Sequence, residues 1–151
     1  MRLVLIFLVT FVVVFFIAVH FLKTKKVSNT VLLPSRKMEG VEDVNSENYD
    51  DVVGHDRYVL IEFYADWCGH CRVFSPTYAK FAKYVQHRPD LVSRLIVAKV
   101  NSPENVRIEQ RYKIEGYPTV LLVPPHSHTW VEFQHSRDVN GLTQFVEEQL
   151  A

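Results

Sequence analysis

Hydrophobic and polar positions divide the chain into an apolar start, a polar connection and a longer region of alternating patterns. Residues 3–22 form a continuous run of twenty residues without Asp, Glu, Lys or Arg. The following positions show no regular period and are rich in Lys, Ser, Thr and Pro. Further on, short apolar runs alternate with stretches whose apolar residues recur every three or four positions. The pattern therefore predicts three parts, residues 1–22, 23–39 and 40–151.

The apolar run is long enough to cross a bilayer as a helix. At about 1.5 Å per residue it would extend roughly 30 Å, the thickness of the hydrocarbon layer. A buried core helix fits poorly, because the run has no polar face. A cleaved signal peptide normally has an apolar region of about 7–15 residues followed by small residues, whereas VHFL and KTKK follow Ala18. We expect an uncleaved anchor at residues 1–22, with a cleaved signal peptide as the alternative.

The charges around this run leave its orientation open. Arg2 precedes it, and Lys23, Lys25 and Lys26 follow it. The positive-inside rule taken alone keeps the rest of the chain in the cytosol, but by a small margin of charge. Residues 23–39 are expected to be a basic, flexible linker between membrane and domain.

The alternating region predicts an α/β domain. Residues 58–65, apolar except for Glu62, and residues 95–100 have the pattern of strands buried on both faces. We expect further strands at 41–44, 119–123 and 129–133, and helices at 46–53, 71–87, 104–112 and 139–150. Ser46 should cap the first helix, and Pro76 should bend the second. The last two strands must be antiparallel, so we expect a mixed central sheet flanked by helices on both faces.

Composition and cysteine count limit the functions that the chain is expected to have. Seventeen basic and seventeen acidic side chains cancel, which gives no sign of nucleic-acid binding. The two cysteines, Cys68 and Cys71, form one CxxC motif, which is typical of a redox dithiol, of half a metal site or of an inert core pair. Zinc needs about four ligands, and His126 and His128, beside two prolines, fit a polar turn better. A redox dithiol without metal or cofactor is the prediction.

The two cysteines are expected to differ in role. Cys68 follows a buried strand and opens a helix, where free N–H groups and the helix dipole favour a thiolate. The thiolate attacks disulfides, so Cys68 is the expected attacking thiol and Cys71, one turn deeper, the resolving thiol. Protonated His70 would make the disulfide a better oxidant. Gly69 permits close approach of a partner chain, and Trp67 offers a flat apolar surface.

These residues resemble a known active site. FYADWCGHCR at residues 63–72, with Pro76 five positions after Cys71, is similar to the active site of a thioredoxin-fold protein disulfide isomerase domain. AKVN at 98–101 and GYPTV at 116–120 match further motifs of that family in the same order. The resemblance covers about residues 40–151. It implies a thioredoxin fold and a thiol–disulfide oxidoreductase that acts on cysteines of folding proteins, with a thiol oxidase or reductase upstream. Together with the anchor, it implies an endoplasmic reticulum membrane protein with a lumenal domain.

The resemblance also implies roles by position. Pro118 matches the family's cis-proline, which faces the CxxC motif, and Tyr117 and Thr119 beside it match a site for a substrate strand. Glu62 matches the buried carboxylate under the active site, with Lys99 as its charge partner.

Two of these matches have alternatives. Glu62 either carries the proton of Cys71 or forms only a structural ion pair with Lys99. Arg137 matches an arginine that in the family can swing toward the second cysteine, and it fits a solvated surface arginine nearly as well.

Three features depart from the family pattern. Asp66 stands where proline is usual and would oppose the Cys68 thiolate. Asn101 replaces the usual aspartate after the third strand and is expected to act as another capping residue. The ending EEQLA does not match a KDEL-type retrieval signal, so retention is expected to depend on the anchor.

Two other functions stay open from the sequence. A cytosol-facing thioredoxin-like reductase would agree with the KTKK flank. An anchored chaperone or adaptor would bind unfolded chains through the apolar surface around Trp67 and Tyr117.

Overall fold

The computed structural model describes residues 37–151, so the expected anchor at 1–22 and nearly all of the expected linker lie outside the described residues. The described elements are, in chain order, β1 (Glu42–Asp43), α2 (Tyr49–Val52), β2 (Tyr58–Tyr64), α3 (Gly69–Gln86), α4 (Pro89–Val92), β3 (Leu95–Asn101), the 3₁₀ turn η1 (Ser102–Glu104), α5 (Val106–Tyr112), β4 (Thr119–Val123), β5 (Val131–Glu132) and α6 (Val139–Leu150). No helix of this part of the chain is both long and apolar enough to cross a membrane.

The strands form one mixed sheet in the order β1-β3-β2-β4-β5. β3 pairs in parallel with both β1 and β2, whereas β4 is antiparallel to β2, and β5 is antiparallel to β4. The parallel step from β2 to β3 needs a crossover, which α3 and α4 supply. The mixed sheet predicted from the sequence is therefore confirmed.

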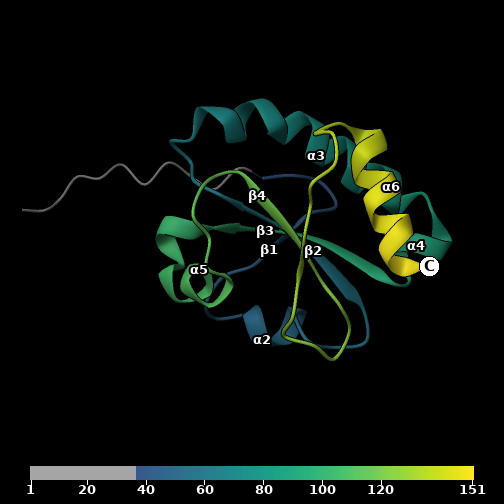
Figure 1. The fold of residues 1–151 in the computed structure, drawn as a ribbon, viewed down its shortest axis with the longest axis horizontal. Coiled ribbons are helices and arrows are strands. Elements are labelled where there is room, and N and C mark those ends of the chain that lie inside the picture. Colours follow the sequence, from purple (N-terminus) through teal and green to yellow (C-terminus); the bar gives the residue numbers. More distant parts are fainter. Residues whose placement is uncertain (1–36) are drawn as a thin grey trace, which may run out of the picture. The chain divides into compact units, whose positions relative to one another are not determined.

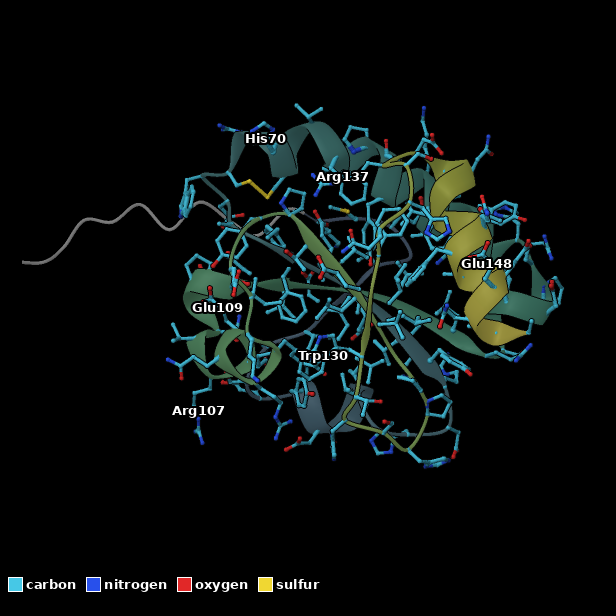
Figure 2. All side chains as sticks on the ribbon, in the orientation of Figure 1. His70, Arg107, Glu109, Trp130, Arg137 and Glu148 are labelled. Carbon is cyan, nitrogen blue, oxygen red and sulfur yellow. A yellow bond between two sulfur atoms is a disulfide. The ribbon has the colours of Figure 1, made fainter. Side chains whose placement is uncertain are left out.

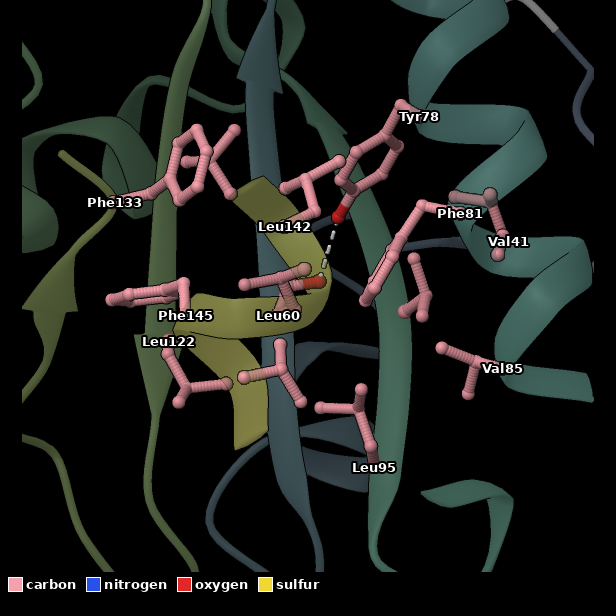
Figure 3. Packing of buried hydrophobic residues seen from close by; sticks show 14 of the residues in the cluster. Val41, Leu60, Tyr78, Phe81, Val85, Leu95, Leu122, Phe133, Leu142 and Phe145 are labelled. Carbon is pink, nitrogen blue, oxygen red and sulfur yellow. Dashed lines mark hydrogen bonds between the residues drawn. The ribbon is translucent and has the colours of Figure 1, made fainter. Parts of the chain in front are cut away.

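Alternate residues of the central strands face two separate apolar clusters. Leu60 of β2 and Leu122 of β4 pack with side chains of α3 and α6 such as Phe81, as Figure 3 shows. Ile61 and Leu121, one position along each strand, pack on the other face with side chains of α2 and α5. Figure 1 shows these two pairs of helices on opposite faces of the sheet. This architecture agrees with the fold that the resemblance implied.

The first helix begins differently from the prediction. α2 starts at Tyr49 with Asn48 as its N-cap residue. Ser46 does not cap it, because the Ser46 hydroxyl donates to Oδ1 of Asn105 at 3.3 Å. The Asn45 side chain instead accepts the N–H groups of Glu47 and Asn48 at 2.8 and 3.2 Å. Asparagine competes well for such local contacts, so Asn45 orders the turn before α2, while the N-cap residue Asn48 makes no side-chain capping bond.

Other boundaries shift by a few residues. α3 begins at Gly69, two residues earlier than expected, and continues through Pro76 to Gln86. β5 is confined to Val131–Glu132. α4 and η1 were not predicted, since elements of three or four residues are too short to show a period in the sequence.

Candidate active site

Cys68 and Cys71 form a disulfide at the N-terminus of α3, next to His70, as Figure 2 shows. Their Cα atoms are 5.3 Å apart. Cys68 ends the turn that leaves β2, where its N–H donates to the Ala65 carbonyl at 3.0 Å. Cys68 is 6% exposed and Cys71 is fully buried. A partner can therefore approach the first sulfur more easily than the second.

The start of α3 places a hydrogen-bond donor on the more exposed sulfur. Cys68 is the N-cap residue, and its Sγ accepts the backbone N–H of Cys71 at 3.1 Å. The first N–H groups of a helix have no partner within the helix, and an 18-residue helix adds its dipole at the same point. Negative charge on Cys68 is thus stabilised when the disulfide opens.

The loop before β4 lies against this sulfur. The Tyr117–Pro118 peptide bond is cis, as the match at Pro118 implied. The Tyr117 carbonyl oxygen is 3.7 Å from Cys68 Sγ. Pro118 is buried, and the Thr119 hydroxyl donates to the Gly116 carbonyl at 2.8 Å within the same turn.

The Tyr117 hydroxyl ties this loop to α5. It donates to Oε1 of Glu109 at 2.5 Å. Partial burial and this carboxylate raise the pKa of Tyr117 to about 12. Glu109 was not predicted, because nothing in the sequence shows which side of α5 meets the loop.

The surface beside Cys68 is open and partly apolar. Trp67 is 67% exposed, and its ring meets the Tyr117 ring edge-on, with centroids 6.0 Å apart. A Cβ atom on Gly69 would meet no atom within 4 Å. His70 is exposed on the first turn of α3. Val73, 79% exposed on the next turn, extends this surface, although the sequence analysis did not single it out.

Two buried charged residues lie opposite each other in the sheet. Glu62 of β2 and Lys99 of β3 are register partners, and both are completely buried. Side chains of a strand alternate between faces, so Glu62 shares a face with Leu60 and Tyr64, the face that α3 covers. Burial, followed by the charge of Glu62, raises the pKa of Tyr78 in α3 well above its usual value.

Lys99 also contacts a residue that the sequence analysis did not identify. Its Nζ forms an ion pair with Oδ1 of Asp43 in β1. The same nitrogen lies 5.2 Å from the centre of the Tyr64 ring and 3.4 Å from the Tyr64 hydroxyl. Asp43 stands in the sequence, but the sequence does not show that β1 and β3 are neighbours in the sheet.

Asp66 and Asn101, the two positions that depart from the family pattern, contact each other. Nδ2 of Asn101 donates to Oδ2 of Asp66 at 3.0 Å. The Asn101 side chain makes no capping bond to η1, which corrects the expected capping role. β3 extends to Asn101 and carries its side chain toward the turn before Cys68 instead.

Arg137 lies in the segment before α6. Its Nη2 donates to the carbonyl of Pro118 at 3.3 Å, so the guanidinium is attached to the cis-proline loop. Figure 2 shows Arg137 on the side of the sheet that carries α3 and the disulfide. Within residues 37–151, no group of three His, Cys, Asp or Glu side chains could hold a metal ion.

Comparisons with known proteins identify relatives of this chain. The Thioredoxin family model matches residues 40–148. The chain is 30% identical over 113 residues to a protein disulfide-isomerase of Hordeum vulgare, covering 74% of this chain and 22% of the relative. It is 33% identical over 116 residues to a probable protein disulfide-isomerase A6 of Medicago sativa, covering 77% of this chain and 31% of the relative.

A solved structure is similar in both sequence and fold. The solution structure of the first thioredoxin domain of mouse protein disulfide-isomerase A4 has 32% identity and a TM-score of 0.65, covering 74% of this chain and 77% of that chain. The chain spans less than a third of the length of the two plant relatives. The family match includes β2, the CxxC turn and the cis-proline loop. The chain belongs to the thioredoxin family.

Proposed function

We propose that this protein is a thiol–disulfide oxidoreductase of the protein disulfide isomerase type, acting on cysteines of folding proteins. The hydrogen bond from the Cys71 N–H to Cys68 Sγ at the start of α3 is the observation that carries the proposal. It stabilises the leaving or attacking thiolate at the more exposed cysteine. The relatives named protein disulfide-isomerase support the same activity.

The exchange takes place through a mixed disulfide. When the domain oxidises a client, a client thiolate attacks Sγ of Cys68, and Cys71 leaves as a thiolate that takes up a proton. A second client thiolate then attacks the client sulfur of the mixed disulfide, and Cys68 leaves as a thiolate. The client gains a disulfide and the domain receives two electrons. Reduction of a client runs through the same steps in reverse.

Buried and surface charges assist these steps in the proposal. Glu62 gives the proton to the Cys71 thiolate during oxidation and takes it back during reduction, and Lys99 balances its charge. His70, when protonated, stabilises the Cys68 thiolate. Arg137 can leave the Pro118 carbonyl and turn toward Cys71. An upstream thiol oxidase or reductase resets the pair.

The client binds on the surface beside Cys68. Its backbone pairs with Tyr117 along the loop that continues through Pro118 and Thr119. Trp67 supplies apolar contact area, and the missing side chain of Gly69 lets the client chain reach the sulfur.

Two cysteine variants of the full chain test the chemistry. Cys68→Ala should abolish insulin reduction and oxidative refolding, because the attacking sulfur is absent. Cys71→Ala should accumulate mixed disulfides with clients, visible on non-reducing gels, because release depends on the second sulfur. A Cys68→Ala protein with full activity in both assays contradicts the proposal.

We further propose that residues 1–22 anchor the protein in the endoplasmic reticulum membrane, that 23–39 form the linker, and that the domain of 40–151 faces the lumen. Protease treatment of intact vesicles tests this topology. Protection of the domain until detergent is added supports it. Digestion without detergent favours the cytosol-facing reductase, which the lysines after residue 22 would accommodate.

The exposed Trp67 and Val73 favour a second candidate, a chaperone or adaptor that binds unfolded chains without needing exchange. The double variant Cys68→Ala/Cys71→Ala distinguishes the two functions. Loss of client protection in this variant supports the oxidoreductase, whereas full protection favours the chaperone.

A further inference from the structure

Three charged residues form one row across neighbouring strands. Asp43 of β1 is the register partner of Lys99 of β3, which in turn is the register partner of Glu62 of β2. The Asp43 side chain is 54% exposed, whereas Lys99 and Glu62 are completely buried. The row therefore begins in solvent and ends in the interior, on the face of the sheet that α3 covers.

The Asp43 contact bears directly on the buried lysine. Burial disfavours a charged ammonium, and an unpaired buried charge strongly destabilises the fold. The Lys99 Nζ contacts the Asp43 carboxylate at one end and lies beside the Tyr64 ring. The charged ammonium is stabilised by an acid that remains in contact with water.

We propose that Asp43 is a positioning residue of this active site, because it fixes how strongly the Lys99 ammonium acts on Glu62. The inference rests on the proposed function, in which Glu62 exchanges a proton with Cys71. A carboxylate on Asp43 offsets part of the positive potential that Lys99 exerts at Glu62, because it places a negative charge two strands away. Glu62 then holds its proton more firmly, so Asp43 adjusts the proton transfer without touching either sulfur.

The other groups around this row do not provide the same control. Tyr64 on β2 faces Lys99 with its hydroxyl, which accepts a hydrogen bond from Lys99 Nζ at 3.4 Å. Tyr78 on α3 has a pKa raised well above its usual value by burial and by Glu62, so it stays neutral in the range of the reaction. Asp66 lies in the turn after β2, where its Oδ2 accepts a hydrogen bond from Asn101. Cys71 is the group with which the proton is exchanged. Asp43 is thus the carboxylate of the row other than Glu62 itself.

The test measures how fast Cys71 resolves a mixed disulfide as a function of pH. In full-length protein, resolution speeds up as Glu62 becomes ionised and can accept the Cys71 proton. Asp43→Asn removes the charge and keeps the size, so the inflection should move to lower pH. A shift of about half a pH unit is expected, since two charges two strand spacings apart interact moderately and exposure of Asp43 weakens the effect.

Matched variants make the result specific. Glu42→Gln removes an exposed acid from the same strand, next to Asp43, and should leave the inflection unchanged. Asp43→Glu should restore the wild-type profile, and Asp43→Asn in a Glu62→Gln background should produce no shift. Asp43→Ser serves as a second neutral variant if Asp43→Asn does not fold.

The outcomes separate the inference from the proposed function. An unchanged inflection in folded Asp43→Asn protein, or a shift to higher pH, overturns the role of Asp43. The attack by Cys68, followed in a Cys71→Ala background, should not respond to Asp43→Asn. Absence of exchange in the wild-type protein itself counts against the oxidoreductase proposal instead.

Discussion

At the residue scale, Asp66 and Asn101, which both depart from the family pattern, contact each other. A proline at position 66 would restrict the backbone of the turn before Cys68. Aspartate does not restrict the backbone in this way, but its hydrogen bond with Asn101 connects the same turn to the end of β3. The acid near the dithiol is therefore held by a neighbouring strand.

This contact can be measured with a double-mutant cycle. Asp66→Ala and Asn101→Ala should each lower the free energy of unfolding, and the loss in the double variant should be smaller than the sum. We expect a coupling of about 1 kcal/mol, the usual net value of a partly buried hydrogen bond. Urea unfolding of the oxidised protein gives the four free energies. Additive losses would show that the two side chains act independently.

At the element scale, sequence patterns predicted the type of each segment, helix or strand, more accurately than its neighbours in the fold. Residues 58–65 appeared as a buried strand, and Cys68 at the start of the next helix, because burial and helix capping leave local signals. The Asp43–Lys99 and Tyr117–Glu109 contacts join segments far apart in the chain. They depend on strand order and helix rotation, which periodicity does not contain. The capping role expected of Asn101 was wrong for the same reason.

The cis-proline loop provides a prediction about alkaline pH. An unfolded tyrosine ionises near pH 10, whereas the pKa of Tyr117 is about 12 in the fold. Between these values the folded state holds a proton that the unfolded state has lost, so stability falls as pH rises from about 10 to about 12. Below pH 10 the full contribution is present.

Tyr117→Phe is the variant that tests this dependence. It removes the titrating hydroxyl, so its stability should fall less steeply than that of the wild type over the same alkaline range. Tyr112 also has a raised pKa, from burial and its bond to Tyr49, so some decline should remain. Equal slopes in denaturant titrations of both proteins would contradict the assignment.

At the scale of the whole domain, two apolar clusters hold the sheet between its helices. Leu142 of α6 is completely buried in the cluster that α3 also joins. Leu142→Ala should reduce the free energy of unfolding by about 2–5 kcal/mol, because it removes packed atoms and leaves a cavity. Val92→Ala, at a 40% exposed position, is the control and should change it by less than about 0.5 kcal/mol.

Exchange activity should separate from stability in this comparison. The disulfide lies in a third, smaller cluster with Tyr64 and Ala65, separate from the cluster of Leu142. Folded Leu142→Ala protein should therefore exchange disulfides at the wild-type rate. Urea unfolding and insulin reduction at a temperature where the variant is folded are the measurements. A large loss of activity in the folded variant would mean that core packing controls the chemistry.

The complete burial of Cys71 has a consequence for captured clients. In the resting disulfide, a thiol from solution can attack the outer sulfur of Cys68 but not the inner sulfur of Cys71. Burial therefore fixes the regiochemistry of capture, since every client is attached at position 68 and the thiol set free is always the inner one. That inner thiol stays beside the new bond, ready to release the client.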